Sequence, residues 1–349
     1  MGVFSFLFYE RLLMAVTPDY NNLTPTTRPH WGGANSDIDQ HLEMYEAGVD
    51  TAFKYNQIFM SLSTQRSVAN KSNTVRIDRM NSTTVKGRKA LEPIEASHVN
   101  SDKMLITVDT QLYIRNAIDD IDDITSPDVW SEMAANNGSE FAETFDEMHI
   151  TQLIKARDWV APAHLKPAFS DGIEIQAVAN LSATTQADAE AAAIALHSAH
   201  KAGVNEMINR KVPLGDMVTL VSVEVFSALI EHPKLLSLEI AGGGNGSYGD
   251  RRVTKMNGVT IVEVTTFPGV DAKPALGLAY ATTEADAACQ MVTFSKSKTL
   301  VTVEAQKFKS LFWKDNNGMK NVLDCTAMYA VACRRPDTCA VVSVQSPTP

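Results

Sequence analysis

The sequence predicts an α+β fold, and three observations support this class. Residues 104–114 alternate apolar and polar side chains, which is the period-two pattern of a strand. Residues 127–159 have the apolar spacing of a long helix. Strand-like runs dominate the last third of the chain without alternating strictly with helices, unlike the pattern of a doubly wound sheet. With 349 residues, of which 44% are hydrophobic, the chain is long enough to bury a large core.

Two strands are expected to form a long hairpin. The segment Thr74–Met80 alternates in the same way as 104–114, with Val75 and Ile77 on its apolar side. We expect these two strands to pair around the polar stretch 81–102. Most hairpin loops are far shorter, so a connection of this length usually has a function.

The predicted long helix starts with favourable residues. Ser126 is a good N-cap, and Pro127 suits the first helical position. At about 1.5 Å per residue the helix would run about 45 Å. The run 136–138 (Asn-Asn-Gly) is expected to weaken or kink it by about 1 kcal/mol. An apolar stripe follows one side of the helix and comprises Val129, Met133, Phe141, Phe145, Met148 and Leu153.

The remaining chain is predicted to hold a second long helix and several short strands. Residues 161–185 are expected to be irregular, and Gln186–Asn209 to be helical, with Pro213 ending that helix. A further short helix is expected to end near Glu231. The run Arg335-Pro336-Asp337 predicts a turn between the last two strands. The strands themselves are expected at 217–223, 259–265, 300–304, 328–333 and 340–344.

The charges are divided between two segments. Residues 64–90 contain seven basic residues and one acid, whereas residues 116–154 contain ten acids and no Lys or Arg. A basic hairpin followed by an acidic helix suits contact with a neighbouring copy better than folding back to make an active site. Exposed ion pairs are worth only about 0–1 kcal/mol each, but linking many of them in one assembly multiplies their effect. The alternative is a solvated loop that binds nothing.

No catalytic, cofactor or metal site is predicted. The run 244–249 matches the GxGxxG pattern, but a strand-like segment follows where dinucleotide binding needs a helix, so we interpret it as a loop. The acids at 119–123 lack the glycine and the terminal glutamate of a calcium loop. No nucleophile, base and orienting residue come together in the sequence.

Composition excludes further classes. A net charge of −10 argues against general affinity for nucleic acid, although it does not forbid enclosing it. The apolar run 3–9 is too short to span a membrane. The cysteines lack paired CxxC spacing, so we expect them to be reduced and packed. They are Cys289, Cys325, Cys333 and Cys339.

The order of arm, basic hairpin, long helix, second helix and sheet resembles the major capsid protein of tailed bacteriophages, specifically the short-tailed, podovirus-like branch. The resemblance covers about residues 35–345, and the order and spacing of short segments support it. These segments are Asp119–Ile124, Asp128-Val129-Trp130-Ser131-Glu132, Gly138-Ser139-Glu140, the strand 258–264 (GVTIVEV), Arg335-Pro336-Asp337 and Ala340-Val341-Val342.

The resemblance implies the Hong Kong phage-type capsid fold. Its parts would be an N-terminal arm (1–60), an extended hairpin loop (61–114), a peripheral domain with the spine helix (115–213) and an axial domain (214–349). The strand 298–306 is expected to return to the peripheral domain. Copies would form hexamers and pentamers of an icosahedral head that encloses the DNA genome, without enzymatic activity, cofactor or membrane. Scaffolding, portal and decoration proteins are the further partners that the resemblance implies.

In this family the extended loop lies over a neighbour's peripheral domain, in agreement with the charge division. We therefore predict an interface between subunits in which basic loop residues meet acidic residues near the spine helix. The predicted interface residues are Arg76, Arg79, Lys86, Arg88, Lys89, Asp119, Asp120, Asp122, Asp123, Asp128, Glu132 and Glu140.

Two other functions remain as alternatives. One is the shell of a cellular, encapsulin-type nanocompartment with the same fold, which would enclose a cargo enzyme instead of DNA. Particle size and the presence of DNA inside would separate it from a phage head. The other is a soluble oligomeric enzyme, which would elute as a dimer or tetramer from a sizing column.

Overall fold

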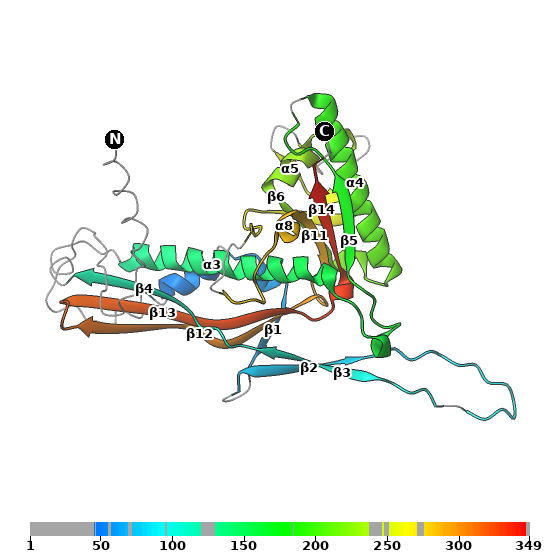
Figure 1. The fold of residues 1–349 in the computed structure, drawn as a ribbon, viewed down its shortest axis with the longest axis horizontal. Helices are drawn as coiled ribbons and strands as arrows, with labels where there is room; N and C mark the ends of the chain where they lie inside the picture. Colours follow the sequence, from blue (N-terminus) through cyan, green and yellow to red (C-terminus); the bar gives the residue numbers. More distant parts are fainter. Residues whose placement is uncertain are drawn as a thin grey trace, which may run out of the picture.

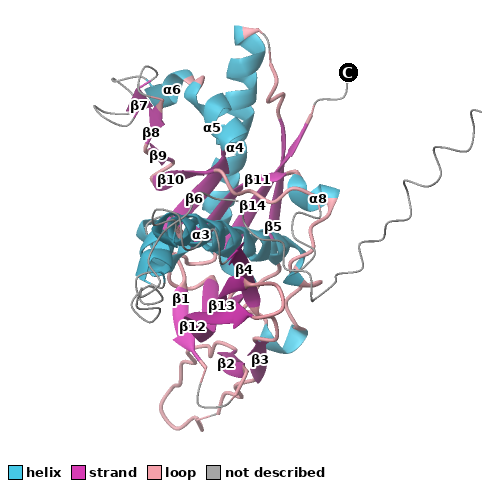
Figure 2. Cartoon of the chain, turned by 90° about the vertical axis from the view of Figure 1, so that its left-hand side faces the viewer, coloured by secondary structure: helices cyan, strands magenta, loops and turns pink. Residues whose placement is uncertain are grey.

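The spine helix α3 (Trp130–Lys155) lies between two sheets in the computed structural model of this chain (Figures 1 and 2). A four-stranded sheet covers one side of α3, and a six-stranded sheet stands over its C-terminal end. The α+β prediction is confirmed. The structure describes residues 45–346, except 46, 55–56, 69–71, 95, 120–129, 184, 237–245, 248–250 and 271–275.

The four-stranded sheet has the order β1-β12-β13-β4. β1 runs parallel to β12, and the other pairs are antiparallel. The predicted strands 300–304 and 328–333 are present but are only parts of much longer strands. In the outer half of β12, exposed lysines (Lys307, Lys309 and Lys314) stand among half-buried aromatic residues, whereas the outer half of β13 is mostly buried. The four strands are Thr64–Ser67 (β1), Leu112–Asp119 (β4), Leu300–Asp315 (β12) and Lys320–Cys333 (β13).

One face of α3 forms the main core with this sheet. The described members of the predicted stripe (Met133, Phe141, Phe145, Met148 and Leu153) are all buried. They pack with sheet side chains of β12 and β13 in one hydrophobic cluster. Ser126, Pro127 and Val129, which the sequence placed at the start of the helix, lie outside the described residues. The helix passes directly into the 3-10 turn Ala156–Asp158 (η2), close to the predicted end.

The predicted kink at residues 136–138 does not occur, because Trp130–Lys155 is one continuous α-helix. Residues 47–54, also helical, cross α3 at Gly138. A Cβ on Gly138 would lie 2.6 Å from both the Cβ of Ala52 and the backbone oxygen of Val49. The glycine therefore allows close packing of two helices and does not interrupt either of them.

The predicted hairpin forms from Thr74–Met80 (β2) and Ser101–Thr107 (β3), in register from Thr74 opposite Thr107 to Met80 opposite Ser101. The single strand predicted over 104–114 is wrong. The chain bends at 108–111, and the second half becomes β4, which pairs with β13 instead. Alternation continues across the bend because each strand has one buried face, so the period does not reveal the change of partner.

The six-stranded sheet has the order β5-β14-β11-β6-β10-β9, with α4 (Gln186–Asn209) and α5 (Val223–Ile230) packed against it. The bounds of α4 match the prediction. Strand β5 lies inside the stretch expected to be irregular, and β11 was not predicted. The six strands are Ile173–Val178 (β5), Met217–Ser222 (β6), Lys255–Met256 (β9), Val259–Val264 (β10), Cys289–Ser295 (β11) and Cys339–Gln345 (β14).

Short elements connect these parts. The predicted final turn is the 3-10 turn η6. Where the described residues continue past the GxGxxG run, they form strands β8 and β9 rather than a helix. The short elements are Phe59–Ser61 (η1), Ala163–Leu165 (η3), Leu214–Asp216 (η4), Pro233–Leu236 (α6), Gly246–Ser247 (β7), Arg252–Val253 (β8), Glu284–Ala287 (α8) and Pro336–Thr338 (η6).

The two sheets draw on distant parts of the chain. β5 and α4 precede residue 214, yet they belong to the six-stranded sheet and its covering layer. β12 and β13 follow residue 214, yet they pair in the four-stranded sheet beside α3. We expected the strand 298–306 to return to the part of the chain that holds the spine helix. This segment overlaps β12.

Candidate assembly surfaces and the joint between the sheets

The loop of the β2–β3 hairpin extends far beyond the body of the chain (Figure 1). The ladder ends where the backbone N–H of Asn81 donates to the carbonyl of Asn100 at 2.9 Å. Every described residue between 82 and 99 is exposed. Among them are large apolar side chains, with Val85 102%, Leu91 100% and Ile94 80% exposed. Apolar groups gathered on an exposed extension typically mark a contact with another molecule.

Three of the predicted basic residues lie in this loop. Lys86, Arg88 and Lys89 are exposed there. Arg76 is exposed on β2 and pairs with Asp78 of the same strand at 2.7 Å. The loop therefore presents positive charge and apolar surface together. Few contacts with the rest of its own chain hold this segment in place.

Arg79 differs from the other four, because it is half-buried and contacts distant segments of its own chain. Its Nη2 donates to the carbonyl of Cys333 at 3.2 Å, and its guanidinium lies 5.6 Å from the ring centre of Trp159. Burial lowers the pKa of Arg79 from its ordinary value. The structure thus places this predicted interface residue at the base of the hairpin, against the body.

The acidic side of the prediction is described only in part. Asp119 is half-buried at the end of β4, and Glu132 and Glu140 are exposed on α3. Asp120, Asp122, Asp123 and Asp128 lie outside the described residues. Between α3 and β4 runs a groove with a volume of about 460 Å³. It is lined by Asn116, Glu132, Met133, Ala135, Asn136, Asn137 and Ser139.

Two of the ten acids counted in residues 116–154 are inside the fold. Asp146 and Glu147 are both buried. The Asp146 carboxylate accepts hydrogen bonds from the backbone N–H groups of Ile58 at 3.0 Å and Phe59 at 3.3 Å. Burial raises the pKa of Asp146 to about 7. This carboxylate therefore fixes η1 to α3 and takes no part in a surface; the clue in the sequence was its position next to Phe145 in the apolar stripe.

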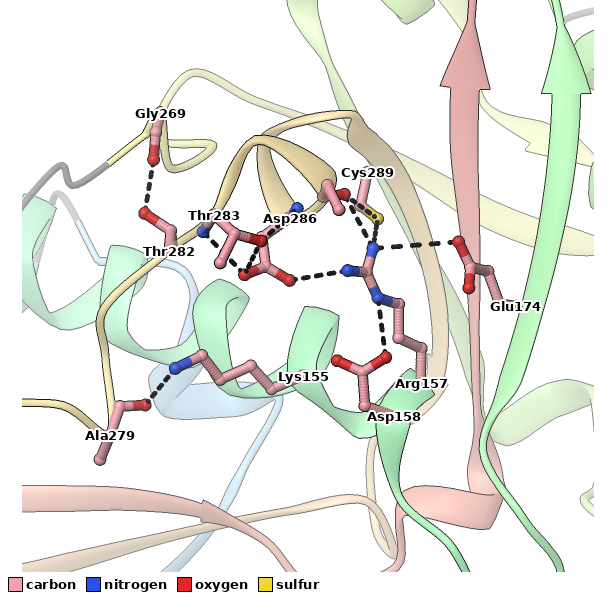
Figure 3. Close-up of polar contacts among 11 residues, drawn as sticks. Lys155, Arg157, Asp158, Glu174, Gly269, Ala279, Thr282, Thr283, Asp286 and Cys289 are labelled. Atoms are coloured by element: carbon pink, nitrogen blue, oxygen red, sulfur yellow. Dashed lines mark hydrogen bonds and ion pairs between the residues drawn. The ribbon is translucent and has the colours of Figure 1, made fainter.

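The C-terminal end of α3 carries a cluster that the sequence did not reveal (Figure 3). Arg157 forms an ion pair with Asp286 at 3.0 Å, and both side chains are 6% exposed. Arg157 Nη1 also donates to the carbonyl of Ala285 at 2.8 Å and approaches Cys289 Sγ at 2.5 Å and Glu174 at 3.9 Å.

Neighbouring contacts extend this joint. Lys155 Nζ donates to the carbonyl of Ala279 at 3.0 Å. Thr283 and Asp286 form a capping box at the start of α8, which orients the carboxylate toward Arg157. The last turns of the spine helix are thereby attached to the chain that leads into β11. Sequence reasoning missed this joint, because Arg157 and Asp286 lie 129 residues apart in the chain.

The described residues contain no group of three or more side chains placed to hold a metal ion, and no helix long and apolar enough to cross a bilayer. All four cysteines are buried as thiols outside any disulfide, in agreement with the prediction that they are reduced and packed. Burial raises the pKa of Cys289 to about 11 and that of Cys333 to about 12, so these thiols stay protonated and unreactive near neutral pH.

Solved structures of two phage capsids and a virus-like particle are similar to this chain. The chain is 42% identical to the subunit in the mature capsid of bacteriophage PhiM1, covering 93% of this chain and 98% of that one, with a TM-score of 0.76. The capsid of the cyanophage P-SCSP1u matches at 18% identity, over 83% and 89% of the two chains, with a TM-score of 0.70.

A more distant match is a virus-like particle from Pyrococcus furiosus. It is 10% identical, over 87% of this chain and 100% of that chain, with a TM-score of 0.53. At such low identity the likeness shows the fold alone. No protein-family model matches this chain, and no curated protein does.

Proposed function

Because this chain belongs to the major capsid proteins of tailed bacteriophages, we propose that the hairpin loop of each copy joins it to the next copy in the head shell. Its place is the virion capsid, and its role is structural and not enzymatic. The Hong Kong phage-type fold predicted from the sequence is confirmed. The 42% identity to the PhiM1 subunit carries this assignment over the nanocompartment alternative.

The proposed contact places the loop on α3 and β4 of the neighbouring copy. Its support is complementarity: Lys86, Arg88 and Lys89 are exposed on the loop, and Glu132 and Glu140 are exposed on α3. Covering the exposed apolar side chains of the loop would add about 25 cal/mol for each Å² removed from water. Each contact is weak, and its repetition around the shell makes it effective. Asp119, Asp120, Asp122, Asp123 and Asp128 are proposed to extend the acidic side.

Charge reversal tests this contact. Changing Lys86, Arg88 and Lys89 to Glu should block assembly while the subunit stays folded, as measured by light scattering and circular dichroism. The matched variant also changes Glu132 and Glu140 to Lys, which restores opposite charges and should recover particles. Normal particles from the loop variant alone would contradict the proposed contact.

We also propose the arrangement of the shell. The six-stranded sheet with α4 and α5 would be the axial part, meeting its copies at the centres of hexamers and pentamers. α3 and the four-stranded sheet would be the peripheral part. The net charge of −10 suits a wall that encloses DNA without binding phosphates tightly. Negative-stain microscopy of the purified protein would test whether it forms closed icosahedral particles.

Finer assignments rest on the sequence segments. The strand 258–264 and the Arg335-Pro336-Asp337 ending support a short-tailed phage as the source. Micrographs of the virion would show a short or a long tail directly. Scaffolding, portal and decoration proteins are proposed as further partners. Co-expression with them should change the yield or the size of particles if the shell needs them.

A further inference from the structure

The hairpin is anchored at its base on one face by apolar packing. Ile77, Ile106 and Val108 are buried against Val301 and Val303 of β12. They cover the face of the four-stranded sheet that is turned away from α3, as Figure 2 shows for β2 and β3. This contact fixes the distance between the base of the hairpin and the sheet. Rotation about the contact is opposed by a second set of contacts.

Asn81, the last residue of the ladder, is clamped to the segment 163–168. Its side-chain amide donates to the carbonyls of His164 at 3.3 Å and Lys166 at 3.0 Å. Its side-chain oxygen accepts from the backbone N–H of Ala168 at 3.3 Å and from that of Ser82 at 2.8 Å. The Asn81 side chain thus both donates hydrogen bonds to the segment 163–168 and accepts one from it, at the point where the loop leaves the body of the subunit.

A cation–aromatic cluster, made of Arg79, Trp159, Phe169 and Arg335, lies next to these hydrogen bonds of Asn81. The guanidinium of Arg79 lies 5.6 Å from the ring centre of Trp159, whose ring meets Phe169 edge-on at 6.2 Å between centroids. The guanidinium of Arg335 lies 4.5 Å from the Phe169 ring centre. Arg335 is held in turn by Asp337 at 2.8 Å. Four side chains, from β2, the residue after η2, the end of the 163–169 segment and the residue before η6, therefore contact one another in sequence.

We propose that Arg79 and Asn81 are positioning residues that set the direction in which the loop leaves the subunit, and through it the curvature of the shell. The proposal rests on the loop contact proposed above. From Asn81 to the tip is an arm of about nine extended residues, or about 30 Å. A rotation of about 10° at the base would move the tip by about 5 Å, which is the spacing of neighbouring strands. A loop that binds in a groove of the neighbouring copy therefore needs the orientation of its base to be fixed to within a smaller angle than this.

The chain contains a matched control for this role. Arg76 and Arg79 lie on the same strand and carry the same charge, but Arg76 is exposed, and its ion-pair partner among the described residues is Asp78 of the same strand. Arg76→Ala removes a charge without changing the cation–aromatic cluster. Arg79→Lys keeps the charge but loses the planar guanidinium that stacks on Trp159.

The direction of the loop can be measured without assembly. Spin labels at Arg88→Cys on the loop and Ser198→Cys on α4 report one distance in the unassembled full chain, and the four native cysteines are buried and should not react. We expect the double variant Arg79→Ala with Asn81→Ala to widen the distance distribution at least twofold, Arg79→Lys to widen it by less, and Arg76→Ala to leave it unchanged. Circular dichroism should show that each variant is folded.

The assembled state gives the second measurement. Particles of the Arg79→Ala, Asn81→Ala variant should vary more in diameter than wild-type particles. An unchanged distance distribution in the double variant would overturn the proposal, and so would equal widening by Arg76→Ala. Failure of the loop contact itself appears differently, as normal particles after charge reversal at the loop tip, so the two ideas fail separately.

Discussion

The Nδ1 atom of His200 accepts a hydrogen bond from the side-chain amide of Asn257 at 2.9 Å. An amide nitrogen only donates, so this ring nitrogen carries no proton. The other ring nitrogen, Nε2, lies 2.8 Å from the hydroxyl of Thr219, which it donates to. His200 is 1% exposed, and the bonds fix it as a neutral ring between α4, β6 and the turn before β10.

This geometry predicts acid sensitivity. Burial lowers the pKa of His200 to about 3 from an ordinary value of 6.5. Because the unfolded chain binds the proton more tightly, stability is present above pH 6.5 and is lost as the pH falls toward 3. At pH 5 the loss from this residue is about 2 kcal/mol. Urea unfolding at pH 7.5 and pH 5 checks this, with His200→Gln expected to lose less stability than the wild type over that interval.

Other histidines nearby act in the same direction. The rings of His197 and His232 lie 4.8 Å apart, and burial lowers the pKa of each. The neighbouring charges of Lys201 and Lys234 disfavour protonation further. An equal slope with pH in the wild type and in His200→Gln would show that His200 does not titrate as its bonds require.

Asp146 should have the opposite dependence. Its pKa is raised by burial from 3.8 to about 7, so the folded state binds the proton more tightly than the unfolded state. Stability from this group is therefore fully present below pH 3.8 and is lost as the pH rises through 7. Between pH 5 and pH 8 the wild type should lose about 3 kcal/mol relative to Asp146→Asn, which does not titrate. The difference between the two unfolding free energies, measured at both pH values, isolates this residue; a constant difference would contradict it.

The joint between the sheets should depend on its buried ion pair. Replacing Asp286 by Asn leaves the 6%-exposed Arg157 without its main partner. Breaking a buried pair on one side typically costs about 3–5 kcal/mol, and we expect a loss near the lower end of that range because Asp158 and Glu174 also face Arg157. The exposed pair between Lys54 and Asp50 is the control, with side chains 60% and 46% exposed. Lys54→Ala should cost less than about 1 kcal/mol. Chemical denaturation of the unassembled subunit distinguishes the two, and similar losses would argue against a special role for the joint.

Several elements could be predicted from the sequence because their signals are local. The bounds of α4 follow from a capping residue, Thr185, whose side chain accepts from Asp188, and from helical spacing up to Pro213. The apolar stripe of α3 was read correctly for the same reason. Signals that depend on partners far along the chain were missed. β5 has only six residues and is recognised by its parallel pairing with β14, about 170 residues away.

For the candidate surface, the charge pattern likewise predicted some features correctly and missed others. The exposed basic loop was predicted, since a long polar insertion between two alternating strands is visible in the sequence. The role of Arg79 was not, because its partners Trp159 and Cys333 come from distant segments. Charge counting also cannot separate Glu140, exposed on α3, from Asp146, buried two turns later. Burial depends on which face the sheet covers, and that is decided by tertiary structure.

Gly138 should tolerate no side chain. Alanine there would gain about 1 kcal/mol in helix propensity. Its Cβ, however, would lie 2.6 Å from Ala52 and from the Val49 carbonyl, and overpacking of this kind costs about 1–3 kcal/mol. We expect Gly138→Ala to lower the unfolding free energy. Gly215→Ala, where no atom lies within 4 Å, should be close to neutral. Thermal melts of both variants compare them directly, and a stabilised Gly138→Ala would mean that the two helices do not meet as described.

The loop should matter for assembly and not for folding. Leu91 is 100% exposed in the isolated chain, so Leu91→Asp removes no internal contact and should change the unfolding free energy by less than about 0.5 kcal/mol. In the proposed shell the same side chain is covered by the neighbouring copy, and burying an unpaired carboxylate there is unfavourable. The concentration needed for assembly, followed by light scattering, should therefore rise about tenfold, the equivalent of about 1.4 kcal/mol per contact. Ile77→Asp serves as the contrasting variant, because Ile77 is buried at the hairpin base and its replacement should destabilise the subunit itself. Assembly of Leu91→Asp at the wild-type concentration would mean that the tip of the loop stays in solvent within the particle.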